Sequence, residues 1–117
     1  MNVETKRRLL DALEACHAIQ QFSAGIDYNG FLADEMRQAA LERKFEILGE
    51  ALNRAEQSDP ELADRLPELR RIIGMRNRII HGYDAVDEEI LWDAVQFKIP
   101  LLSEQVLIVL REAGEDI

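Results

Sequence analysis

The side chains best suited to catalysis are concentrated in one stretch of this 117-residue chain, from Met75 to Tyr83. Asn77 directly follows Arg76, and His81 lies five positions after that arginine. At 100° per residue, Asn77 and His81 lie on one helical face, whereas Arg76 and His81 are roughly 140° apart. The long arginine can still bring its head toward the imidazole around one side of the helix end.

These residue types suit the cleavage of a phosphodiester. Histidine titrates near neutral pH and can act as general acid or base, and arginine presents a charged fork that matches phosphate. Tyr83 can orient a group through its hydroxyl or stack on a base. With no metal-ligating carboxylate cluster beside them, the residues fit metal-free cleavage of RNA. In that reaction the ribose hydroxyl attacks, His81 moves protons and Arg76 stabilises the pentacovalent phosphate.

A purely structural interpretation fits the same spacing. Basic side chains are common at the C-terminal end of a helix because they stabilise the negative end of its macrodipole. Gly82 is also the residue expected just after such an end. Spacing alone therefore leaves both interpretations open.

Length and charge limit the possible partners. A chain of this size predicts a single domain over residues 1–117. Its formal net charge of −9 argues against binding nucleic acid with the whole surface. The arginines near the central stretch form the one concentrated basic patch, which would suit a short RNA segment. They are Arg70, Arg71, Arg76 and Arg78.

The sequence also predicts a cytoplasmic protein. The N-terminus alternates polar and apolar residues, unlike a signal peptide, and no apolar run approaches membrane-spanning length. The single cysteine, Cys16, lies in an apolar helical stripe and is expected to be a small core residue.

Apolar periodicity predicts an all-α protein, an antiparallel bundle of four or five helices. A short turn through Leu62 supplements four longer helices. Asn29-Gly30 is expected to form a turn, Trp92 to lie in the core and Pro100 to kink the last helix. The four predicted helices are Val3–Phe22, Phe31–Glu56, Glu68–Ile80 and Glu88–Arg111.

The second predicted helix contains an informative pair. Gly49 lies mid-helix, where glycine costs roughly 1 kcal/mol relative to alanine, so we expect another helix to approach closely there. Glu50 is either solvated or part of an ion pair between helices or between subunits, for example with Arg43. The apolar stripe of this helix begins at Met36. Two long helices beside a shorter one leave apolar surface uncovered, which suggests a homodimer with the second or the last helix as its seam.

The central stretch resembles the Arg-x4-His-x-Tyr motif of HEPN-domain proteins, most closely the HepT branch, the toxins of MNT/HepT toxin–antitoxin modules. The similarity covers nearly the whole chain. The segments that carry it are Phe31–Leu32, Ala40–Arg43, Ile47–Ala51, Ile73–Asn77, Arg76–Tyr83, Tyr83–Asp87, Trp92 and Ile99–Leu102.

This resemblance implies a dimeric HEPN bundle whose two motifs face each other across a cleft, acting as a metal-independent endoribonuclease without a cofactor. Arg76 and His81 would be catalytic, with Asn77, Arg78 and Tyr83 supporting them or contacting RNA. The resemblance further implies that a cognate MNT-type nucleotidyltransferase antitoxin neutralises the protein and can attach AMP to Tyr83.

Two alternatives remain open at this point. The chain could be a non-catalytic helical subunit that binds a minimal nucleotidyltransferase and presents Tyr83 to it or shapes its site. It could also be a helical interaction domain in which the charged cluster serves only the fold.

Overall fold

Side-chain caps start most of the helices in the computed structural model, which describes residues 1–81 and 87–117, with the side chains of 79–81 excepted. Asn2, Asp27, Asp34 and Asp87 each accept a hydrogen bond from a backbone N–H of the following turn, at 2.7 to 3.2 Å. Such caps satisfy amides that the helix itself leaves unpaired. The described helices are α1 (Val3–Ser23), α2 (Tyr28–Leu32), α3 (Glu35–Ser58), α4 (Leu62–Arg65), α5 (Leu69–His81), α6 (Glu88–Asp93) and α7 (Ile99–Glu112).

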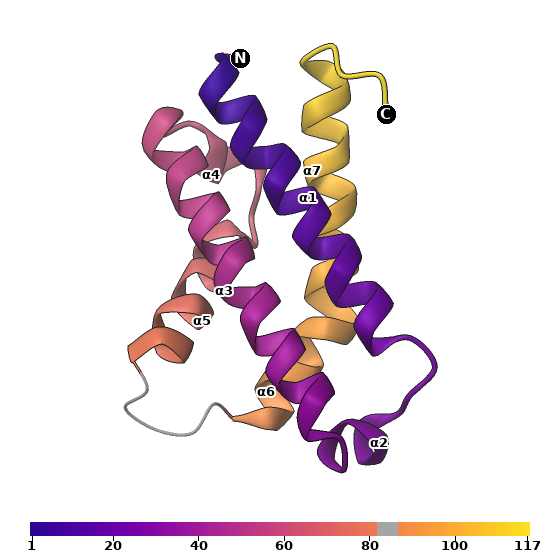
Figure 1. The fold of residues 1–117 in the computed structure, drawn as a ribbon. Helices are drawn as coiled ribbons and strands as arrows, with labels where there is room; N and C mark the ends of the chain where they lie inside the picture. The colour runs from indigo at the N-terminus through magenta and orange to yellow at the C-terminus, as the bar shows by residue number, and fades with distance from the viewer. Residues whose placement is uncertain (82–86) are drawn as a thin grey trace.

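The helices form an antiparallel bundle centred on α3 (Figure 1). Helix α1 packs against α3 and α7, and α5 packs against α3. Both termini lie at one end of the bundle, and α5 ends and α6 begins toward the other (Figure 1). The predicted all-α fold is confirmed. The largest fully buried side chains belong to Phe31, Phe45, Leu9, Ile19, Leu41, Leu48, Leu52, Leu62, Leu66, Leu69, Ile72 and Leu91.

The predicted start of the second long helix is wrong. The short α2, to which Phe31 belongs, ends at Leu32, and Asp34 caps a new helix, so α3 starts at Glu35. The Asn29-Gly30 pair, predicted as a turn, lies inside α2 because Asp27 caps that helix through Gly30 N. Met36 is 84% exposed, and the buried stripe of α3 starts instead at Leu41.

The last long helix is irregular just before Pro100. A π-helical turn over Ala94–Lys98 joins α6 to α7, and Ile99 N donates to the carbonyl of Ala94. The wide turn fits the missing N–H and steric demand of the proline ring, so the predicted irregularity takes the form of a π turn. Trp92 packs against the core, as predicted, with its ring 5.0 Å from that of Phe31.

The only cysteine of the chain lies in the core, as predicted. Cys16 is fully buried, and burial raises the pKa of its thiol to about 12. This confirms a structural core cysteine. Among the described helices, none has the length and apolarity needed to span a membrane.

The predicted close approach at Gly49 is confirmed, and the approaching helix is α5. A Cβ atom built on Gly49 would lie 2.2 Å from Cβ of Arg76 and 2.6 Å from its Cγ. Any side chain at position 49 would push α5 off α3. The absence of a side chain there therefore sets the distance between the helix that carries the central stretch and the centre of the bundle.

Replacement of Gly49 by alanine should lower the free energy of unfolding by about 1–3 kcal/mol, because the methyl group collides with the stem of Arg76. Gly74→Ala is a matched control on α5, where an added Cβ meets nothing within 4 Å. There the gain in helix propensity should stabilise the protein by up to about 1 kcal/mol. Urea unfolding of both variants measures the difference. Equal effects of the two substitutions would contradict a tight helix crossing.

Candidate functional site at the crossing of α3 and α5

Helix α5 carries the predicted site residues. Arg76, Asn77 and Arg78 lie in its C-terminal half, and His81 is its last residue. The backbone is thus helical from Arg76 to His81, as the spacing argument required. The side chain of His81 and all of Tyr83 lie outside the described residues. The predicted helix stop at Gly82 also lies outside them.

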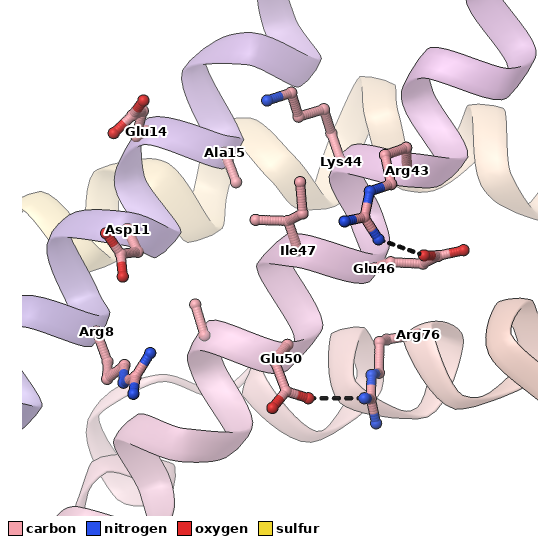
Figure 2. A pocket seen from close by; sticks show the side chains of 11 residues that line it. Arg8, Asp11, Glu14, Ala15, Arg43, Lys44, Glu46, Ile47, Glu50 and Arg76 are labelled. Carbon is pink, nitrogen blue, oxygen red and sulfur yellow. Dashed lines mark hydrogen bonds and ion pairs between the residues drawn. The ribbon is translucent and has the colours of Figure 1, made fainter.

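Arg76 is held by two polar contacts. Its Nη2 donates to Oε2 of Glu50 at 2.6 Å (Figure 2). Its Nη1 donates to Oδ1 of Asn77 at 3.0 Å. Its Nε is buried and has no hydrogen-bond partner among the described residues. With a side chain only 23% exposed, Arg76 is a half-buried residue with a defined direction and differs from a freely moving surface arginine.

The carboxylate of Glu50 binds two arginines at once. While Oε2 accepts from Arg76, Oε1 accepts from Nε of Arg54 at 2.6 Å. Arg43, suggested above as the partner of Glu50, instead pairs with Glu46 at 2.9 Å. The predicted ion pair between helices is therefore confirmed, but with Arg76 as the partner. Within one chain Arg43 precedes Glu50 by seven residues, about two turns, beyond the three- or four-residue separation of helical neighbours. Arg54, four residues after Glu50, has that separation, and this spacing was the overlooked signal.

A groove of about 400 Å³ runs between α1, α3 and α5 beside this cluster. Figure 2 shows side chains of both charge signs along it, with Arg76 and Glu50 on the α5 side. The residues that α1 contributes were not predicted as part of a site, because their charged pattern is that of an ordinary solvated helix face. The charged lining residues are Arg8, Asp11, Glu14, Arg43, Lys44, Glu46, Glu50 and Arg76.

The predicted basic patch is interleaved with carboxylates. Arg70 lies 3.4 Å from Glu56, and Arg71 lies 3.7 Å from Glu68. Both arginine side chains are largely exposed, so these pairs are weak and open to exchange with other anions. Together with the Glu50 contact, they reduce the positive potential that four arginines suggest from sequence alone.

Acidic groups gather where α6 begins, toward the end of the bundle at which α5 finishes. The pKa of Glu42 on α3 is raised, first by burial and then by the neighbouring carboxylates Glu88 and Glu46.

Fold and site together define an all-α bundle with an arginine-centred polar cluster where two helices cross. Residues 12–109 match the family described as HepT-like, "Ribonuclease HepT-like". Since the match spans most of the sequence, the chain belongs to the HepT-like ribonuclease family.

Curated relatives agree with this membership. A protein of Methanocaldococcus jannaschii named "Putative RNase MJ1380" is 33% identical over 108 residues, which cover 91% of this chain and 96% of that protein. One of Thermococcus cleftensis named "Probable ribonuclease HepT" is 36% identical over 97 residues, 83% of this chain and 87% of the relative. No solved structure matches the chain at a significant level.

The Arg76–Glu50 pair should be energetically distinct from the exposed pair one turn away. In a double-mutant cycle, Arg76→Ala and Glu50→Ala should show a coupling energy of about 1 kcal/mol, because the arginine is half buried. The cycle of Arg43→Ala and Glu46→Ala, where the arginine side chain is 68% exposed, should give less than about 0.5 kcal/mol. Thermal or urea unfolding supplies both values. Similar coupling in the two cycles would contradict a special contact at the crossing.

Proposed function

We propose that this protein is a metal-independent endoribonuclease toxin that acts in the cytoplasm as part of a toxin–antitoxin system. It cleaves RNA at a composite site formed by two copies of the chain and is neutralised by a cognate nucleotidyltransferase antitoxin. The observation that carries the proposal is the pre-oriented Arg76, five residues before His81 on one continuous helix, in a chain of the HepT-like ribonuclease family.

The proposed reaction is an in-line transesterification of RNA. The ribose 2′-oxygen forms a bond to phosphorus, the bond from phosphorus to the 5′-oxygen breaks, and the products are a 2′,3′-cyclic phosphate and a 5′-hydroxyl. One histidine removes the proton of the 2′-hydroxyl and another protonates the leaving oxygen. Arg76 stabilises the charge that builds on the non-bridging oxygens. Histidine and arginine thus supply both functions, so the reaction requires no metal ion.

The need for an acid and a base is one reason to propose a composite site. Each chain contributes one His81 to the central stretch, so two copies facing each other supply both proton carriers. Asn77, Arg78 and Tyr83 would support Arg76 or contact the RNA strand. An isolated chain would have only half of the acid–base machinery.

Exposed apolar residues support the last helix as the seam of this homodimer. Ile90, Phe97, Leu101 and Ile108 lie seven, four and seven positions apart and are 44–71% exposed. Spacings of four and seven residues place side chains on one face of a helix, and an exposed apolar face of this kind typically packs on a partner helix. Helix α3, the other candidate seam, is already covered by α1 and α5.

The proposed antitoxin would act on Tyr83, two positions after His81 in the sequence. Transfer of AMP to its hydroxyl adds a phosphate and an adenosine next to the proposed cleavage site. The added negative charge would compete with RNA for Arg76, and the adenosine would occupy space at the cleft. The specific observation that favours the alternative, a non-catalytic partner subunit, is that Glu50 already occupies a donor of the Arg76 guanidinium in the free chain.

His81→Ala and Arg76→Ala should each lower RNA cleavage by about 100-fold or more, since the first removes a proton-transfer group and the second removes a donor that stabilises the transition state. Cleavage by the wild type should persist in EDTA. In cells, the wild type alone should arrest growth and degrade RNA, His81→Ala should not, and co-expression of a cognate nucleotidyltransferase should restore growth. RNA integrity on gels and growth curves provide the measurements.

Controls separate this function from the alternatives. Thermal unfolding should show that His81→Ala remains folded. Tyr83→Phe, which has no hydroxyl to accept AMP, should resist neutralisation by AMP transfer. A clean, unmodified wild-type preparation that neither cleaves RNA nor arrests growth, yet binds the nucleotidyltransferase, would favour the partner-subunit alternative. If His81→Ala and Arg76→Ala change stability alone, the cluster serves only the fold.

Phe97→Glu should convert the dimer to a monomer, because it places a charge at the centre of the proposed apolar seam. The residue is 71% exposed in the single chain, so monomer stability should change little. Met36→Glu is the matched control, since Met36 is an exposed apolar residue on α3. Analytical ultracentrifugation reports both states. Dissociation by Met36→Glu with an intact Phe97→Glu dimer would move the seam to α3.

A further inference from the structure

We propose that Glu50 is a positioning residue that sets the direction of the Arg76 guanidinium for phosphate, with Arg54 holding Glu50 from the other side. The inference rests on the proposed function, because it assigns a supporting role to a residue next to the proposed catalytic arginine. It adds the chain Arg54–Glu50–Arg76 to the site that the central stretch predicted.

The backbone part of the positioning comes from the helix crossing. Gly49 allows the stem of Arg76 to lie directly on α3, where a Cβ on the glycine would be 2.2 Å from Cβ of the arginine. Glu50, the next residue along α3, then lies within reach of the guanidinium. The stem and the head of the arginine are thus fixed by two consecutive residues of one helix.

The contacts leave part of the guanidinium available. An arginine has five N–H donors. One N–H of Nη2 donates to Glu50 and one N–H of Nη1 donates to Asn77, while the Nε group is buried. One donor remains on each terminal nitrogen, and a pair of this kind matches two oxygens of a phosphate.

Arg54 explains how Glu50 can hold Arg76 without neutralising the site. A lone arginine–glutamate pair has no net charge, whereas two arginines on one carboxylate have a net charge of +1. Because each oxygen of Glu50 accepts from a different arginine at 2.6 Å, the carboxylate is also prevented from rotating away. The cluster therefore combines a fixed geometry with residual attraction for an anion.

Glu46 provides a matched comparison within the same molecule. It lies one turn before Glu50 on α3, lines the same groove and pairs with a single, largely exposed arginine. Glutamine at either position removes one negative charge from the same region. Only at position 50 does the change release Arg76.

The test compares single-turnover and steady-state cleavage of a short RNA by the dimeric protein and its variants. Glu50→Gln should lower kcat by about tenfold or more with KM changed less than about threefold, since an unfixed arginine loses alignment in the transition state. Glu50→Ala should lower kcat further, because alanine has no acceptor at all. Glu46→Gln should stay within about twofold of the wild type. Thermal unfolding of each variant checks that it is folded.

An NMR readout separates this inference from the proposed function. The ¹⁵N Nε–H signal of Arg76, assigned by its loss in Arg76→Lys, should show restricted motion in the wild type and Glu46→Gln and increased motion in Glu50→Gln. Unchanged motion, or a kcat equal to or above the wild-type value in Glu50→Gln, overturns the positioning role. If the wild type fails to cleave RNA, the proposed function falls, while the NMR comparison still decides whether Glu50 fixes Arg76.

Discussion

The contact between Gly49 and the stem of Arg76 is the constraint on which the rest of the site depends. Helix α5 makes most of its packing contacts in the described chain with α3, so the α3–α5 interface determines where the central stretch lies. A helix interior normally disfavours glycine because of its backbone entropy. Here the missing side chain is what allows two helical backbones to approach at the position where an arginine must be held. Gly49 thus lowers the local stability of α3 but fixes the location of the Arg76 side chain.

The polar part of the site follows from that proximity. Once α5 lies on α3, the guanidinium of Arg76 is next to Glu50, and the i, i+4 spacing brings Arg54 to the same carboxylate. A molecule with a formal net charge of −9 can therefore keep a small positive site, because neighbouring acids such as Glu46 and Glu56 pair with other arginines. Long-range attraction of RNA is correspondingly weak. Short-range, directed hydrogen bonds to phosphate would have to supply more of the recognition.

Sequence patterns predicted the helices and the close approach at Gly49, since periodicity and glycine placement are local signals. The boundary at Asp34 was missed because an apolar stripe appeared to continue back to Met36, and a capping aspartate was not weighed against it. An ion pair between helices was predicted for Glu50, but Arg76 was not identified as its partner. Arg76 is 26 positions away, and only the crossing of α3 and α5 brings it near. Long-range pairs of this kind have no signature in the spacing of a single sequence.

The spacing of Arg76 and His81 acquires a physical meaning from this arrangement. The arginine lies at the helix crossing, where packing fixes it, whereas residue 81 is the last residue of α5. One residue more or less between them would rotate the second position by 100° and shift it by about 1.5 Å relative to the first. Because Gly49 anchors the first position to the bundle, the five-residue spacing sets where the second is presented. The position of residue 81 relative to the bundle is therefore determined by its five-residue distance from the helix crossing. For this reason the motif depends on α3 as much as on α5, the helix that contains it.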